Sequence, residues 1–245
     1  MMLFAASAAL SQKRGYVGDS KMNGTVSALT GASWYYAYNT IDPFTSDNGG
    51  TPHEQFVPMH WCFSNETVPD GTNLSHFMGY NEPNDIHSCN KSPQATAIAW
   101  RSVMDAFPSS RLVSPASAGF GVFWFDDFFA NCTVLYGKDG CRISAIAAHD
   151  YDCNPVSTLE YLRFLSLRYG LPIWLTEFSC GDGKEDSPMS AQLSFMQLIF
   201  PMLEAAPFIE RFAWMSAHGA NRSLVNLGTD GRAELTPLGV LFNSL

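Results

Sequence analysis

Charged residues are scarce in this sequence, and basic residues are the scarcer of the two signs. Asp, Glu, Lys and Arg make up 15% of the 245 residues, and 23 acidic against 14 basic side chains leave a formal net charge of −9. Nucleic-acid backbones and anionic membrane surfaces repel such a chain, so we expect neither as a partner. A neutral polymer is the better match.

Three further absences narrow the function. No apolar run reaches the length of a membrane span, which argues against a membrane-spanning protein. No Gly-x-Gly-x-x-Gly loop follows a predicted strand, so a dinucleotide site is not expected. The six histidines show no His-Glu-x-x-His or comparable spacing, and we expect neither a metal nor another cofactor.

Cysteines and glycosylation sequons indicate export. Six cysteines accompany six Asn-x-Ser/Thr sequons, at Asn23, Asn65, Asn73, Asn90, Asn131 and Asn221. This combination is typical of an oxidising compartment, and we expect a secreted glycoprotein of the extracellular space or cell wall. Residues 1–12 hold a short apolar run, a candidate remnant of a signal segment, which leaves 13–245 as a single domain.

The order of β-rich and helical segments predicts an α/β fold, a (β/α)8 TIM-like barrel. The chain is close to the roughly 250 residues of such a barrel, and short β-rich runs alternate with helical segments. An open doubly wound sheet is the alternative. The eight predicted strands are 14–19, 33–39, 55–61, 76–81, 111–115, 145–151, 172–178 and 211–216.

Helix signals are clear in the second half of the barrel and weak in the first. Four capping residues stand directly before a proline suited to a first helical turn: Ser92, Asn154, Ser187 and Thr236. The segment 156–169 runs helically to a stop at Gly170. The connection 61–74 is short and polar, so we expect the early half to be irregular and poor in helix.

Two glutamates end predicted strands that face each other across the barrel mouth. Functional residues of barrels collect at the carboxyl ends of strands, where Glu82 and Glu177 lie. Together they predict glycoside hydrolysis, in which one carboxyl protonates the leaving oxygen and the other attacks the anomeric carbon. A retaining enzyme would hold them about 5–5.5 Å apart, and an inverting one about 6.5–9.5 Å. The alternative for each glutamate is a buried ion pair with arginine.

His149 and Tyr151 end the predicted strand beside Glu177. Either side chain could hydrogen-bond that carboxylate and orient it. For His149, a histidine satisfied by core partners is the alternative.

Tryptophans at strand ends and in loops suit sugars, whose apolar faces pack on flat rings. We expect Trp61, Trp124 and Trp214 to contact the substrate. Trp34 and Tyr36 are expected to fill the core instead.

Ordered motifs along the chain resemble one family. From about Lys13 to the C-terminus the sequence is similar to glycoside hydrolase family 128, the β-1,3-glucanases of the large retaining glutamate-pair clan. The motifs, in order, are Lys13-Arg14-Gly15, Phe56-Val57-Pro58-Met59, Gly79-Tyr80-Asn81-Glu82-Pro83, Ser114-Pro115-Ala116, His149-x-Tyr151, Trp174-Leu175-Thr176-Glu177-Phe178 and Arg211-Phe212-Ala213-Trp214.

The resemblance implies residue roles. Glu82 matches the family's acid/base and Glu177 its nucleophile, while Asn81 should hydrogen-bond the sugar 2-hydroxyl beside the scissile bond. Asn84 departs from the expected aspartate, which puts a neighbouring hydrogen bond in doubt. The expected enzyme is a monomeric, retaining endo-β-1,3-glucanase that acts on β-glucan.

Two other functions stay open. A non-catalytic β-glucan-binding or structural glycoprotein could keep the same barrel, since one fold hosts many functions. A hydrolase of another β-linked glycan would share the chemistry, because linkage is set by the shape of the groove.

The cysteines follow the same predicted strands. Cys62 with Cys89 and Cys153 with Cys180 lie on adjacent loops, and Cys132 with Cys141 would close a local loop. This is one of 15 connectivities that six cysteines allow, so the pairing is a hypothesis.

Overall fold

Parallel strands whose faces are both buried form the centre of the computed structural model, which describes residues 10–18, 22–181, 187–218 and 220–245. Every residue of the strand Ile173–Phe178 is buried, as expected where helices cover one face of the strand and the filled barrel interior covers the other. The strands of this sheet are β1 (Arg14–Val17), β2 (Trp34–Tyr36), β3 (His76–Met78), β4 (Arg111–Val113), β5 (Ile143–Asp150), β6 (Ile173–Phe178) and β7 (Ile209–Trp214).

The sheet curls into a barrel whose eighth position is irregular. Its order is β2-β1-β7-β6-β5-β4-β3, and all neighbouring strands are parallel. The segment 55–61 closes the gap: Val57 N–H donates to Tyr35 O at 2.9 Å, and Met78 N–H donates to Pro58 O at 3.0 Å. The predicted barrel is thus confirmed, but the predicted strand 55–61 forms only isolated bridges. Pro58 contributes to this irregularity because it has no N–H to donate.

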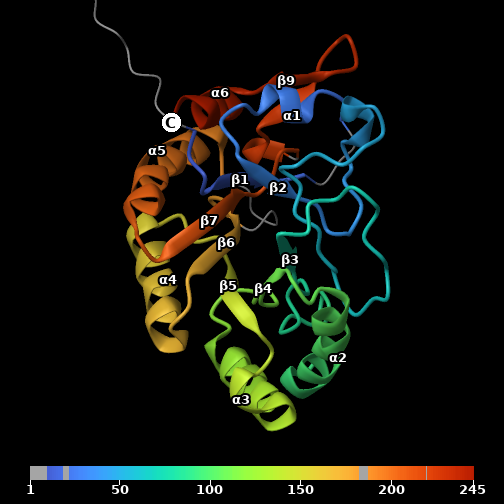
Figure 1. The fold of residues 1–245 in the computed structure, drawn as a ribbon. Coiled ribbons are helices and arrows are strands. Elements are labelled where there is room, and N and C mark those ends of the chain that lie inside the picture. Colours follow the sequence, from blue (N-terminus) through green and yellow to red (C-terminus); the bar gives the residue numbers. More distant parts are fainter. Residues whose placement is uncertain (1–9, 19–21, 182–186, 219) are drawn as a thin grey trace, which may run out of the picture.

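Helices lie outside the strands, as Figure 1 shows. They are α1 (Thr25–Ala28), α2 (Pro93–Ala106), α3 (Val122–Tyr136), α4 (Pro155–Tyr169), α5 (Met189–Ala205) and α6 (Pro237–Ser244). Long loops cover the side between β2 and β3, where only the 3-10 turn η1 (Thr45–Asn48) forms, which confirms the irregular early half. The later part adds η2 (Gly137–Asp139), η3 (Ala220–Arg222) and the hairpin β8 (Val225–Leu227) and β9 (Ala233–Leu235).

Three of the four predicted helix starts are confirmed. Ser92, Asn154 and Thr236 are N-caps whose side chains accept backbone N–H groups, each followed by proline. The prediction for Ser187 was wrong by one position, because α5 begins at Met189 and Pro188 stands at the cap. None of the helices in the described part of the chain is long and apolar enough to cross a membrane. Asp19, an expected strand end, lies outside the described residues, as does most of the segment 1–12.

Side chains from alternate strand positions fill the barrel interior. Trp34, Tyr36, Met78 and Trp174 belong to this inner cluster, and Trp34 therefore fills the core as expected. On the outside, Trp100 of α2 packs so closely against the strand exit that a Cβ on Gly79 would meet its ring at 2.3 Å. Only glycine fits there, and it precedes the substrate-binding candidate Asn81 by two residues and the catalytic candidate Glu82 by three.

The three predicted disulfides are confirmed. Cys62–Cys89 and Cys153–Cys180 each join two loops at the carboxyl ends of the strands. Cys132–Cys141 joins the last part of α3 to the connection that follows it. The first two bridges each span 27 residues and the third spans 9. Because a longer closed loop removes more freedom from the unfolded chain, the bridges differ in their expected contribution to stability.

Removing the bridges should reveal that difference. A Cys132→Ala/Cys141→Ala variant is expected to lose about 2.5 kcal/mol of unfolding free energy, and a Cys153→Ala/Cys180→Ala variant about 3.5 kcal/mol. Urea denaturation without reductant measures both. An undiminished free energy in the first variant would contradict the expectation.

Candidate active site

Glu82 lies four residues beyond the end of β3, next to the isolated bridge between Asn81 and Ala116. Its N–H donates to Ala116 O at 2.9 Å, and Asp85 N–H donates to Glu82 O at 3.0 Å. Its φ of 42° is in the left-handed region, which residues other than glycine rarely adopt. Such a conformation persists where the surroundings over-determine it, and it often marks a functional position.

Glu177 lies inside β6, in register with His149 of β5. Only 4% of Glu177 is exposed. Tyr38 OH donates to its Oε1 at 2.8 Å and Tyr36 OH at 3.3 Å, while Tyr151 OH donates to Oε2 at 2.5 Å. Three hydroxyls thus compensate a buried carboxylate that would otherwise be costly.

His149 connects the two glutamates. Its Nδ1 lies 2.8 Å from Glu82 Oε1, and its Nε2 lies 3.4 Å from Glu177 Oε1, an ion-pair distance without hydrogen-bond geometry. Oxygens of the two carboxylates lie within 4.8 Å of each other. Both carboxylates are therefore close enough to reach a single glycosidic bond, as glycoside hydrolysis requires.

Burial and the carboxylates set the protonation of their partners. Burial by itself lowers the pKa of His149, but Glu177 and Glu82 outweigh it and raise that pKa above its ordinary value. Burial and then Glu177 raise the pKa of Tyr36 and of Tyr151. Both phenols therefore stay protonated and donate to the carboxylate, and the two glutamates favour the protonated form of His149.

These groups open into a cleft of about 520 Å³ at the carboxyl ends of the strands. Trp61, which is 42% exposed, and Asn81 line it beside Glu82. Asn81 Nδ2 donates to Ser88 Oγ at 3.1 Å. The remaining polar lining residues are Tyr38, Asp85, His149, Asp150, Tyr151, Asp152, Glu177 and Arg222. Five carboxylates against one arginine make the cleft unsuited to an anionic ligand.

The structure places two of the predicted substrate contacts away from this cleft. Trp214 is fully buried, packs on Phe178 and Phe200 and donates from Nε1 to Arg222 O at 2.9 Å. It occupies the strand face that meets the helix layer, whereas the contact required the interior face. Trp124 stacks on Phe128 within α3 and does not line the cleft.

The hydrogen bonds of Asn84 explain why an asparagine stands where an aspartate was expected. Its Oδ1 accepts from Ala118 N–H at 2.8 Å, and its Nδ2 donates to Ala118 O at 2.9 Å. An aspartate could make only the first of these bonds, because a carboxylate has no N–H. The amide therefore ties the Glu82 loop to the loop after β4 more completely.

Sequence reasoning missed several contacts at the cleft. Tyr36 fills the core as expected, and in addition it donates to Glu177. Tyr38 lies near the end of the predicted strand 33–39, but its bond to Glu177 was not expected, although Trp34, Tyr36 and Tyr38 alternate at the spacing of one strand face. That spacing could have placed both hydroxyls in the barrel. Arg222 had no assigned role. Nothing in the sequence brings Arg222, from a turn after β7, to the cleft.

Glu82, His149 and Glu177 are also the one group among the described residues with ligand atoms close enough to hold a metal ion. An ion would need those atoms at about 2.0–2.2 Å. Here His149 Nδ1 already bonds to Glu82, and Glu177 accepts three hydroxyls. The arrangement fits proton transfer and nucleophilic attack better than metal binding.

Comparisons with known proteins agree with this geometry. A family model described as glycosyl hydrolase catalytic core matches residues 14–242. A subgroup II family 128 endo-β-1,3-glucanase from Pseudomonas viridiflava is 29% identical, with a TM-score of 0.74 over 96% of this chain and 98% of that one. A subgroup I enzyme from Amycolatopsis mediterranei, solved with laminarihexaose, is 25% identical, with a TM-score of 0.77 over 96% and 99%.

A curated relative is longer. Alkali-sensitive linkage protein 1 of Schizosaccharomyces pombe is 25% identical over 193 residues, which are 76% of this chain and 34% of that protein. The chain thus spans about a third of the length of this relative. The resemblance to family 128 is confirmed by the solved structures. Because the family model covers nearly the whole chain, the protein belongs to the glycosyl hydrolase catalytic core family.

Proposed function

We propose that this protein is a retaining endo-β-1,3-glucanase in which Glu82 is the acid/base and Glu177 the nucleophile. The observation that carries the proposal is the pair of carboxylates within 4.8 Å at the mouth of a glycosyl hydrolase barrel. The linkage is supported by the endo-β-1,3-glucanase activity named for relatives at 25–29% identity.

The first step would form a covalent glycosyl-enzyme. Glu82, which is partly exposed to the cleft, donates a proton to the glycosidic oxygen while Glu177 attacks the anomeric carbon. The three tyrosine hydroxyls orient Glu177 toward the cleft. In the second step Glu82, now ionised, takes a proton from water, and that water releases the sugar from Glu177.

The cleft supplies binding groups for a neutral glycan. Asn81 lies next to Glu82 and would hydrogen-bond the 2-hydroxyl of the sugar at the scissile bond. Trp61 offers an exposed ring for the apolar face of a sugar, and His149 and Tyr151 line the same cleft. The acidic lining favours an uncharged β-glucan over an anionic polymer.

We also propose that the protein is secreted. Three disulfides form and persist in oxidising compartments, and six sequons would be glycosylated there. The monomeric state remains a prediction from the sequence.

Replacing the nucleophile tests the assignment. Glu177→Gln should lower the release of reducing ends from a linear β-1,3-glucan at least about a thousandfold, equal to about 4 kcal/mol of barrier, because the amide cannot attack. The exposed Glu160→Gln on α4 is the matched control and should keep full activity. A wild type that binds the glucan without cleaving it would favour a binding protein, and cleavage of another linkage alone would reassign the substrate.

Removing the acid/base should affect substrates unequally. Glu82→Ala is expected to lose most activity on glucan but much less on an aryl glycoside whose leaving group needs no protonation. Azide should rescue this variant and yield a glycosyl azide of retained, β configuration. An α-configured product would rule out the double displacement.

The raised pKa of His149 predicts a pH-dependent contribution to stability. A histidine in the unfolded chain has a pKa of about 6.5, so the folded protein binds this proton more tightly. The stabilisation is complete below about pH 6.5 and is lost as the pH rises through the folded-state pKa. Urea denaturation from pH 6 upward should show a steeper loss in the wild type than in His149→Gln, with the exposed His87→Gln as control. Parallel curves would refute this role.

A further inference from the structure

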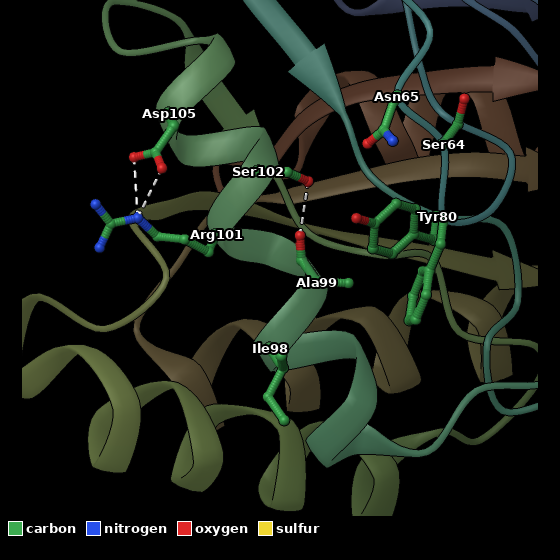
Figure 2. A pocket seen from close by; sticks show the side chains of 9 residues that line it. Ser64, Asn65, Tyr80, Ile98, Ala99, Arg101, Ser102 and Asp105 are labelled. Atoms are coloured by element: carbon green, nitrogen blue, oxygen red, sulfur yellow. Dashed lines mark hydrogen bonds and ion pairs between the residues drawn. The ribbon is translucent and has the colours of Figure 1, made fainter.

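The loop beyond Trp61 presents an aromatic ring and an asparagine on one groove. This groove, of about 580 Å³, lies between the loop and α2, and we call it the α2 groove. Phe63, Ser64 and Asn65 line it from the loop, and Ile98, Arg101 and Ser102 line it from the helix. Figure 2 shows Ser64 and Asn65 on one side, Arg101 and Ser102 on the other, and Tyr80 between them. The groove contains none of the groups assigned to catalysis.

Several bonds hold the loop in place. Ser64 Oγ accepts from Glu66 N–H at 3.0 Å, and Glu66 O lies 3.0 Å from His60 Nε2. Thr40 Oγ1 donates to Thr67 O at 3.1 Å. The Cys62–Cys89 bridge anchors the start of the loop. These bonds restrain the loop on both sides of Phe63 and Asn65.

The chemistry of the α2 groove suits a sugar. Phe63 is 37% exposed, and its ring lies 4.9 Å from Tyr80 and 5.5 Å from Lys91 Nζ. Across the groove Arg101 pairs with Asp105, and both remain largely exposed. An apolar ring beside charged hydrogen-bonding groups matches a pyranose, which has apolar C–H faces and hydroxyl edges.

Asn65 stands at this groove and begins the sequon Asn65-Glu66-Thr67, with the Phe63 ring two residues before it. Asn65 is exposed, and its side chain has no hydrogen bond to any residue that the structure describes. By contrast, Nδ2 of Asn73 donates to Glu54 O and Nδ2 of Asn131 donates to Asp127 O. The amide nitrogen of Asn65 is therefore free to carry a substituent that enters the groove.

We propose that Asn65 carries an N-linked glycan whose first sugar lies in the α2 groove against Phe63. The Asn65 amide nitrogen bonds to the anomeric carbon of an oligosaccharide held by a lipid diphosphate. The bond to the diphosphate breaks, the diphosphate leaves with the electron pair, and the amide loses one proton. The inference rests on the proposed export of the chain, and it is independent of glucanase activity.

Occupancy is measured on protein secreted by a eukaryotic host. Enzymatic release of glycans in water labelled with oxygen-18 converts each glycosylated asparagine to a labelled aspartate, which peptide mass spectrometry locates. We expect Asn65 to be labelled in the wild type and in Thr67→Ser, which keeps the sequon, and unlabelled in Thr67→Ala. An unlabelled Asn65 in the secreted wild type would overturn the proposal.

Coupling to Phe63 tests where the sugar lies. Thr67→Ala should lower the melting temperature by about 2–4 °C relative to Thr67→Ser. Phe63→Ala should cost clearly more in the Thr67→Ser protein than in the Thr67→Ala protein, since only the former carries the glycan. Asn73→Gln, which removes another sequon, should show no coupling to Phe63.

Two results would assign the groove differently. An equal cost of Phe63→Ala in both backgrounds would place the glycan outside the groove. A second glucan-binding event on protein with unmodified Asn65, lost in Phe63→Ala, would give the groove to an external glucan. Reducing-end release by the same samples reports separately on the proposed glucanase function.

Discussion

The burial of the Glu177 carboxylate is the constraint on which the barrel mouth depends. A carboxylate that is 4% exposed is unfavourable in the folded protein unless its oxygens accept hydrogen bonds. The donors are Tyr36 and Tyr38, from β2 and its exit, and Tyr151, just after β5. Since β1 and β7 separate β2 from β6 in the sheet, only a curled barrel brings these hydroxyls to β6. Closure of the barrel therefore also orients the proposed nucleophile.

Disulfides and side-chain hydrogen bonds link the loops of the rim. Disulfides tie the loops that follow segment 55–61 and β3, and those that follow β5 and β6, so each glutamate lies in or beside a cross-linked pair of loops. Asn84 adds a two-bond clamp to Ala118 on the next loop. With these restraints the left-handed backbone of Glu82 can be maintained. In the described stretch between β2 and β3 no α-helix forms, and the loop that presents Phe63 and Asn65 belongs to this stretch.

Strong local signals made much of this structure predictable. Buried apolar runs, and Ser92, Asn154 and Thr236 before prolines, marked strands and helix starts because such signals act within a few residues. The glutamates were recognisable because carboxylates at the ends of apolar strands need a reason to be there. Ser187 failed as a cap, and segment 55–61 failed as a full strand, because backbone hydrogen bonding around Pro188 and Pro58 decided those boundaries.

The sequence by itself determined the barrel class, the catalytic candidates Glu82 and Glu177 and the pairs of cysteines that could meet. It did so because strand order and motif order place these groups at one edge of a parallel sheet. Only the tertiary structure decided which strand face each side chain takes. It turned Trp214 into the helix layer, placed His149 between two carboxylates and brought Arg222 to the cleft, because these positions depend on curvature and packing between segments far apart in the chain.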